Sequence, residues 1–312
     1  MNERRRCVSW WALGVVCVVA FSIARVGAQT QAPTHGQNVQ PAYEGWTRNA
    51  NGTFTLYFGY MNRNLVEEPN VAVGADNGFE PGPPDRGQPA HFYPRRQQFV
   101  FAVTVPADWG DKKLVWSVTH NGRTDRAVGK LTSLWALDPG VWFANRVGNS
   151  AIGNREFATQ QPPSTEIVGA DQVTATVSDG VSLAVAVKDD GLPGPADDRI
   201  QLGARENRLR AAPIRTVQTD ETGASVASNQ SGPPTQDIVT ADSAAKTGLA
   251  LTWLHYRGPG KVTFEPMITP LNKLGGEART QARFSQPGTY VLRAVADDGM
   301  LTTPVTVTVT VK

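Results

Sequence analysis

The sequence predicts an all-β protein made of two antiparallel β-sandwich domains. Two kinds of observation lead to this fold class. Apolar residues alternate with polar ones, at the period of a strand, in separate short segments along most of the chain. Turn pairs such as Asn121-Gly122 and Asp179-Gly180 lie between these segments, and a Pro-rich stretch, QQPPS at 160–164, divides the pattern in two.

The front domain is expected over residues 43–131. Three of its segments place large apolar side chains on one face at period two, so three strands share a predicted core. These sets are Phe54, Leu56, Phe58 and Tyr60; Phe99, Phe101, Val103 and Val105; and Leu114, Trp116 and Val118. Residues 74–96 are rich in Gly and Pro and are expected to form a long surface loop, where binding residues tend to lie on such scaffolds.

The second domain is expected over residues 166–312, after a connection at 132–165 that carries Trp135 and Trp142. Within this domain residues 193–248 lose the strand pattern and are polar and rich in Gly, Ala, Ser and Thr. So long a stretch without periodicity is unusual inside a domain. We therefore expect it to be an exposed, partly disordered insertion.

The first 28 residues are typical of a secretory signal peptide. MNERRR is cationic, CVSWWALGVVCVVAFSIA is apolar, and Val26-Gly27-Ala28 supplies small residues at a cleavage site. An uncleaved membrane anchor is the alternative, because the apolar run is about long enough to span a bilayer. Residues 29–42 are polar and are expected to be a flexible lead-in. The protein is therefore expected to be secreted or periplasmic.

The charge of the chain changes when this leader is removed. The full sequence has a formal net charge of +2, and residues 1–28 contain four arginines and one acid, so the remainder carries −1. A chain that is not basic lacks the electrostatic basis for binding nucleic acid, or an anionic membrane. Both cysteines, Cys7 and Cys17, leave with the leader, which excludes disulfides and thiolate chemistry and leaves stability to the hydrophobic core.

Two aromatic residues indicate that the second sandwich is immunoglobulin-like. In such folds a Trp on the third strand packs the core, and a Tyr near the start of the sixth strand binds backbone two residues before a core position. Trp253 in LTWLHY and Tyr290 in GTYVL fit these places. Leu292 then occupies the position that a disulfide cysteine often holds.

The second domain also resembles a known family. The runs DDGLP, LALTWLHYRGPGKVTFEP and ARFSQPGTYVLRAVADDGMLTTPVTVTVTV are similar to the immunoglobulin-like repeats of the PKD (polycystic kidney disease) group in bacterial surface and secreted proteins. The insertion and the missing DFGDG-type signature depart from that pattern. The resemblance implies a sandwich fold and a spacer, adhesive or accessory role, and it implies no particular ligand.

The front domain is similar to the leading part of exported bacterial proteins with no assigned activity. The segments YEGWTRNANGTFTLYFGYMNRN and QPAHFYPRRQQFVFAVTVPADWG carry this similarity. It implies only that the two domains belong together.

No catalytic motif occurs in the sequence. It contains no HExxH, GxSxG or GxxxxGK[ST] pattern, and its four histidines, His35, His91, His120 and His255, are not spaced as metal ligands. His91 in HFYPRR is the most suggestive, and we expect it to anchor a loop rather than to catalyse. We predict no enzyme activity, no catalytic residue, no cofactor and no metal site.

Three weaker signals leave alternatives open. Acidic pairs at 189–190, 197–198 and 297–298 offer Ca²⁺ ligands or ordinary Asp-Gly turns. The residues are Asp189, Asp190, Asp197, Asp198, Asp297 and Asp298. Aromatic residues offer sugar stacking or packing, and the two neighbouring arginines offer carboxylate pairing. These residues are Trp46, Trp109, Trp135, Trp142, Arg95 and Arg96.

The function predicted from these signals is a non-catalytic binding or structural module of the cell envelope or secretome. The partner is expected to be an unidentified protein or glycan of the envelope, with no nucleic acid and no membrane contact beyond an uncleaved leader. A carbohydrate-binding accessory protein is the first alternative, and it requires a planar patch of exposed aromatic rings. A secreted hydrolase is the second, and it requires a cleft with converging carboxylates or His91.

Overall fold

The computed structural model of the chain describes residues 33–138, 159–192 and 248–312. The predicted signal peptide, most of the Trp-bearing connection and almost all of the predicted insertion lie outside these residues. Two β-sandwiches form within residues 34–312, which confirms the predicted fold class. The exact domain boundaries remain a prediction.

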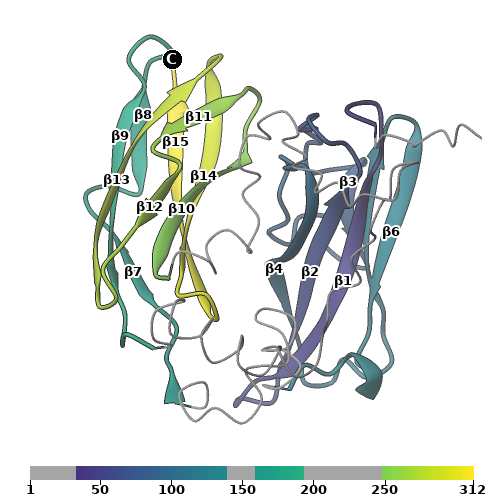
Figure 1. Cartoon of the computed structure of the whole chain (residues 1–312). Helices are drawn as coiled ribbons and strands as arrows, with labels where there is room; N and C mark the ends of the chain where they lie inside the picture. Colours follow the sequence, from purple (N-terminus) through teal and green to yellow (C-terminus); the bar gives the residue numbers. More distant parts are fainter. Residues whose placement is uncertain (1–32, 139–158, 193–247) are drawn as a thin grey trace, which may run out of the picture. The chain divides into compact units, whose positions relative to one another are not determined.

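The front sandwich consists of two three-stranded sheets (Figure 1). One sheet has the order β1 (Val39–Arg48), β2 (Phe54–Asn62), β4 (Arg95–Val105), and all its pairs are antiparallel. The other has the order β3 (Asn77–Glu80), β5 (Leu114–His120), β6 (Arg123–Gly129). A short 3₁₀ turn, η1 (Ser133–Trp135), follows. β1 begins before Tyr43, inside the segment expected to be a flexible lead-in.

The predicted core of this sandwich is confirmed except at one strand. Leu56, Phe58, Leu114 and Trp116 have no exposed surface and pack in a single cluster. Phe99 is the exception, because the β2–β4 pairing shifts between Phe58 and Tyr60 and the β4 strand bulges. The Phe99 ring therefore packs against Tyr57, on the face opposite to the core.

The segment 74–96 is more ordered than a surface loop, so that prediction was wrong in part. It contains β3, which pairs with β5, and it contributes Phe79 and Phe92 to the core at 2% and 0% exposure. Asn77 explains why a Gly- and Pro-rich stretch holds this shape. Its amide nitrogen donates to the carbonyls of Val71 and Pro89, and its amide oxygen accepts from the Trp116 indole. A buried amide with these partners fixes the loop onto the sheet.

The β5–β6 hairpin turns at Asn121-Gly122, as the sequence predicts. Both residues have positive φ, at 50° and 71°. Two successive residues of positive φ are the requirement of a type I′ turn, which Asn and Gly meet at low cost.

The second sandwich has the strand arrangement of an immunoglobulin-like fold (Figure 1). One sheet has the order β12 (Ile268–Pro270), β10 (Ala250–Arg257), β14 (Gly288–Asp297), β15 (Thr302–Val311), β8 (Gln172–Ala175). The other has the order β11 (Val262–Glu265), β13 (Gly275–Phe284), β9 (Val181–Lys188), β7 (Ser164–Ile167). β8 pairs in parallel with the last strand, so the first strand of the domain changes sheets between β7 and β8.

This change of sheet separates the two strands that flank Asp179-Gly180, the turn pair found in the sequence. The turn does form, with a bridge between Thr176 and Gly180. However, β8 pairs with β15 whereas β9 pairs with β7 and β13, so the two strands lie in opposite sheets.

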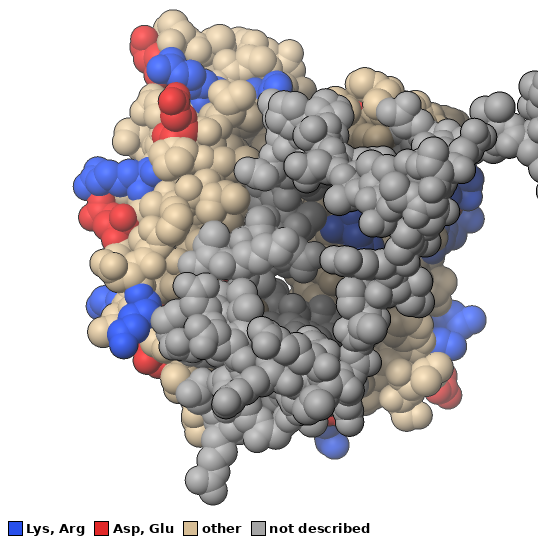
Figure 2. Space-filling model, viewed as in Figure 1, with Lys and Arg blue, Asp and Glu red and all other residues tan. Residues whose placement is uncertain are grey.

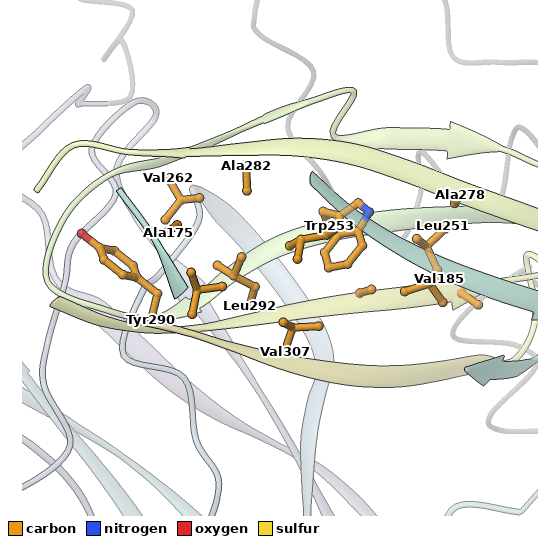
Figure 3. Close-up of a cluster of buried hydrophobic side chains, with 14 of the residues drawn as sticks. Ala175, Val185, Leu251, Trp253, Val262, Ala278, Ala282, Tyr290, Leu292 and Val307 are labelled. Carbon is orange, nitrogen blue, oxygen red and sulfur yellow. The ribbon is translucent and has the colours of Figure 1, made fainter. Parts of the chain in front are cut away.

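The core between these sheets is closed at one end by Tyr290 (Figure 3). Trp253 and Leu292 have no exposed surface, and Val307, Val309 and Val311 of the last strand face the same cluster. The Tyr290 hydroxyl donates to the carbonyl of Gln286 at 2.8 Å, which is the corner expected from the sequence. Gly258 is required beside it, because a Cβ there would collide with the Tyr290 ring.

Replacing Tyr290 by Phe tests this corner. We expect Tyr290→Phe to lower the free energy of unfolding by about 1 kcal/mol, because it removes one hydrogen bond and keeps the ring. Chemical denaturation monitored by tryptophan fluorescence measures the change. Tyr57→Phe provides a comparison in the front sandwich, because it removes a hydroxyl whose contact with the Thr47 hydroxyl is longer, at 3.2 Å. A loss at Tyr290 no larger than experimental error would mean that the hydroxyl does not stabilise the fold.

Candidate functional site

The two sandwiches meet along a seam that joins residues 85–100 of the front sandwich to β10 and β14. The backbone amides of Ala90 and His91 both donate to the carbonyl of Tyr256, at 2.9 and 3.2 Å. The Tyr256 hydroxyl donates to the carbonyl of Gly87, and Arg257 forms a bidentate pair with Asp85 at 2.8 and 2.9 Å. The seam therefore combines backbone and charged hydrogen bonds.

The sequence contains a signal for this seam in the strand β10. β10 reads ALTWLHYR, in which residues of both faces are buried or half-buried. Its inner face carries Leu251 and Trp253, and its outer face carries Thr252, Leu254 and Tyr256. A near-continuous apolar run is typical of a strand covered on both faces, whereas a strand with one face in water alternates.

A cavity of about 130 Å³ lies at the seam, between the outer face of β10, β14 and β15 and the bulge of β4. We call it the seam cavity. Phe99 has a φ of 50°, in the left-handed region that large side chains rarely adopt, so the bulge is strained. The bulge places the carbonyl of Val100 where the Arg293 guanidinium donates to it at 3.1 Å. The strained backbone and Arg293 thus form adjoining parts of the cavity wall.

His91 lies in the seam with both ring nitrogens engaged. Nδ1 is 3.0 Å from the side-chain oxygen of Asn70, and Nε2 is 3.1 Å from a carboxylate oxygen of Glu68. The ring is 4% exposed and packs edge-on against Tyr93. The expectation of a loop-anchoring His91 is consistent with these contacts, which tie together segments far apart in the sequence.

His255 stacks on His91, a contact that the sequence did not predict. The ring centroids are 4.3 Å apart and the rings are inclined by 28°. His255 is 1% exposed and neither ring nitrogen makes a hydrogen bond. Burial and, to a smaller extent, the charge of His91 lower the pKa of His255 from 6.5 to about 3, while the backbone of Arg257 acts in the opposite direction. His255 is therefore neutral at physiological pH.

The remaining histidines lie away from the seam cavity. His35 is exposed and its Nδ1 is 3.0 Å from the Thr34 hydroxyl. His120 precedes the hairpin turn, and its Nε2 is 3.4 Å from a carboxylate oxygen of Glu67.

Of the two arginines that suggested carboxylate recognition, Arg96 has a structural partner. Arg96 forms a bidentate pair with Glu44, at 2.6 and 2.7 Å, across the front sheet. Burial raises the pKa of Glu44, while the Arg96 charge lowers it. Arg95 has a φ of 68°, in the left-handed region, at the start of β4. Arg96 is thus occupied within the protein.

The acidic pairs that lie in the described residues form Asp-Gly turns at strand ends. Asp189 accepts from the amide of Gly191, Asp297 accepts from the amide of Gly299, and Asp298 accepts from the amides of Met300 and Leu301. Asp190 accepts from the amide of Leu192. Asp197 and Asp198 lie outside the described residues. In residues 33–138, 159–192 and 248–312, no group of three or more His, Cys, Asp or Glu side chains is placed to hold a metal ion.

Asp298 is nevertheless unusual. It is 3% exposed, and its Oδ2 is buried without a hydrogen-bond partner. Burial, aided by the neighbouring charges of Asp297 and Asp189, raises the pKa of Asp298 from 3.8 to about 7 against the two backbone hydrogen bonds, which lower it. Burial also raises the pKa of Asp189.

The described tryptophans do not form an exposed aromatic patch. Trp109 is buried at 8% exposure, and Trp46 packs edge-on against Phe54 with its indole donating to the carbonyl of Thr132. Trp135 is 41% exposed and packs against Tyr43. Trp142 lies outside the described residues. The planar platform that the carbohydrate-binding alternative requires is thus not formed by the tryptophans in the described part of the chain.

Charged side chains are mixed on the face shown in Figure 2. Along the outer edge of the second sandwich, basic and acidic residues alternate among uncharged ones. This distribution agrees with the near-neutral charge of residues 29–312. In the described ranges, no helix is both long and apolar enough to cross a membrane.

Comparisons with known proteins show no family for this chain. No protein-family model matches it, and no curated protein has a significantly similar sequence. Among solved structures, the S-layer protein rSbsC(31-844) is 11% identical over 88% of this chain and 28% of its own length, with a TM-score of 0.22. The D00-D0 domain of intimin is 8% identical over 87% of this chain and 99% of its own length, with a TM-score of 0.23.

A third solved structure contains the three N-terminal domains of the outer capsid protein Hoc of bacteriophage RB49. It is 8% identical over 88% of this chain and 58% of its own length, with a TM-score of 0.19. This chain thus spans less than two thirds of two of the three proteins. Likenesses at this level carry no argument about function, and the fold rests on the strand order described above.

Proposed function

We propose that this protein is an exported, non-catalytic binding or structural module of the cell envelope or secretome, built from two coupled β-sandwiches. The PKD-type resemblance of the second sandwich belongs to this proposal, as do the leader and the secreted or periplasmic location. The partner is a protein or glycan of the envelope. The observation that carries the proposal is the seam, because it holds the two sandwiches together through groups that an enzyme would need free.

The state of the two seam histidines supports a role without catalysis. A general base must have a nitrogen within reach of a substrate proton. Both nitrogens of His91 face protein oxygens, and His255 is sealed at 1% exposure with a pKa of about 3. Neither ring presents a nitrogen to a substrate. Their contacts instead fix one sandwich against the other, which suits a spacer or a binding surface of fixed geometry.

The coupling is tested by weakening the seam. We expect Arg257→Gln to lower the unfolding midpoint of the whole protein, with a loss of about 1 kcal/mol, because the bidentate pair with Asp85 is partly exposed. Calorimetry is expected to show one cooperative transition for the wild-type protein. Arg279→Gln, which removes a pair with Glu277 inside the second sandwich, is the matched control. Two separate wild-type transitions would contradict the coupling.

The location is tested by fractionation. The full chain is expected in the envelope or the medium, and a version without residues 1–28 is expected in the cytoplasm. Accumulation of the full chain in the cytoplasm would contradict export.

The variant His91→Gln tests the non-catalytic role. The proposal would be overturned if the wild-type protein hydrolysed a substrate from a panel of esters, peptides and glycosides and this variant did not.

A further inference from the structure

Two tyrosines in the seam cavity accept hydrogen bonds through their hydroxyl oxygens. Within the described residues, no acceptor receives the proton of either hydroxyl. The Tyr60 oxygen accepts from the backbone amide of Tyr93, at 2.9 Å. The Tyr93 oxygen accepts from the backbone amide of His255, also at 2.9 Å. A phenol both donates and accepts, so each O–H proton remains to be donated. Both residues line the seam cavity, and Tyr60 is 2% exposed.

Arg293 adds a positive charge to the same cavity. Its guanidinium carbon lies 3.5 Å from the centre of the Tyr256 ring, and one terminal nitrogen donates to the carbonyl of Val100. Its Nε is buried and has no hydrogen-bond partner. Within residues 33–138, 159–192 and 248–312, Arg293 forms no ion pair with an acidic side chain. A partly buried charge without a counter-ion is unfavourable, and an anion beside it offsets the cost.

The tyrosines are donors over the whole physiological range. Burial raises the pKa of Tyr60 and of Tyr93, so both hydroxyls keep their protons. Among the described residues that line the cavity, Asp297 is the one acidic residue. It stands four strand positions after Arg293 on β14, which separates their backbones by about 13 Å at the usual strand rise. The polar end of the cavity near Arg293 is therefore rich in donors.

The size and the walls of the cavity limit what it can accept. Its volume of about 130 Å³ is close to the roughly 150 Å³ of an engineered protein cavity that binds one benzene molecule. Phe99, Val100, Leu254 and Val295 supply apolar walls. An oligosaccharide or a peptide segment is too large, whereas an anionic head on a short apolar body matches both the donors and the walls.

We propose that the seam cavity binds a small carboxylic acid, whose carboxylate pairs with Arg293 and the tyrosine hydroxyls and whose apolar body lies against the bulge of β4. This inference rests on the proposed function, because it names the ligand class of a binding module. It also gives the strained φ of Phe99 a role, since that conformation forms the cavity wall and directs Val100 toward Arg293.

Butyrate and butyramide test the proposal, because they have the same shape and differ in charge. On the wild-type protein, butyrate is expected to raise the unfolding temperature in a saturable manner and to give heat in calorimetric titration, whereas butyramide is expected to do neither. This comparison needs no variant and is independent of folding defects. Equal effects of the two compounds, or no effect of butyrate at concentrations up to ~50 mM, would overturn the proposal. A site that is not occupied at this concentration binds too weakly to be a specific carboxylate site.

The variant Arg293→Met keeps the length and apolar stem of the side chain and removes its charge. It is expected to weaken butyrate binding at least about tenfold, the loss of one charge-assisted contact. Arg283→Met, on an exposed arginine of β13, is the matched control and is expected to bind as the wild type does. Butyrate binding that survives in Arg293→Met would place the site elsewhere. Binding of inorganic phosphate in preference to butyrate would overturn the carboxylate assignment.

These results separate the inference from the proposed function. Fractionation and the seam variant decide whether the protein is an exported, coupled module. The pair of ligands decides only whether its cavity takes a carboxylate. A coupled, exported protein that ignores butyrate would refute this inference and leave the module intact.

Discussion

Asp298→Asn is expected to stabilise the protein at pH ~8 by about 2–3 kcal/mol more than at pH ~5. The reason is the burial of the Asp298 carboxyl, which raises its pKa from 3.8 to about 7. The favourable contribution of this group is full below pH 3.8, and it is lost as the pH rises through 7, because the unfolded chain releases the proton first. Asn keeps the oxygen that accepts from Met300 and Leu301 and cannot ionise.

Denaturant titration at both pH values measures this effect. Asp171→Asn, at an exposed position of the same sandwich, is the matched control for the loss of one negative charge. If Asp298→Asn has the same effect at pH ~5 and pH ~8, the carboxyl ionises in the folded protein as freely as in the unfolded chain, and its burial has no electrostatic cost. That outcome would contradict the geometry of the β14–β15 turn.

The second large effect concerns His255 and has the opposite sign. In the wild-type protein, His255 is expected to lower the free energy of unfolding by about 2 kcal/mol when the pH falls from ~7 to ~5. The pKa of His255 falls from 6.5 to about 3 because the ring is buried against His91. Its contribution is present above pH 6.5 and is lost as the pH falls toward 3, since the unfolded chain takes up the proton first.

Two variants that do not titrate, His255→Leu and His255→Gln, are expected to lack this pH-dependent loss of stability. Each changes the absolute stability through packing, so the decisive quantity is the difference in unfolding free energy between the two pH values, compared with the wild type. Using two different side chains keeps shape effects from imitating the result. An unchanged pH difference in both variants would mean that His255 is accessible to protons in the folded state.

The two groups oppose each other in the wild-type protein. Between pH ~4 and ~6.5, rising pH restores the contribution of His255 while it removes that of Asp298. We therefore expect the wild-type pH profile in this window to be flatter than that of either variant. In each single variant, the free energy of unfolding is expected to change with pH through the group that remains. In the double variant His255→Leu, Asp298→Asn, it is expected to change little with pH.

The sequence by itself determined the fold class and much of each core. Period-two patterns found the inner faces of β2, β5 and β15, and Asn121-Gly122 found the hairpin. Trp253 and Tyr290 located the third and sixth strands of the immunoglobulin-like sandwich. These features are local, or they depend on a single buried side chain, so they are readable along the chain.

Features set by pairing between distant segments were not predicted. The bulge of β4 moves Phe99 off the core face because β2 offers one residue where β4 has three. Residues 74–96 looked like a surface loop because Gly and Pro conceal the buried Phe79 and Phe92. The strands around Asp179-Gly180 lie in opposite sheets, and an alternating pattern is the same whichever sheet a strand joins.

The candidate site was decided by the tertiary structure. His91 and His255 are 164 positions apart in the numbering of the chain, and nothing in either neighbourhood indicates that they stack. The seam cavity needs the outer face of one sheet and the strained bulge of another. Burial, which sets the pKa values of His255 and Asp298, is a property of the packed fold, since each desolvating neighbour arrives from a different strand. The sequence determined which side chains are present, and packing determined their burial and their pKa values.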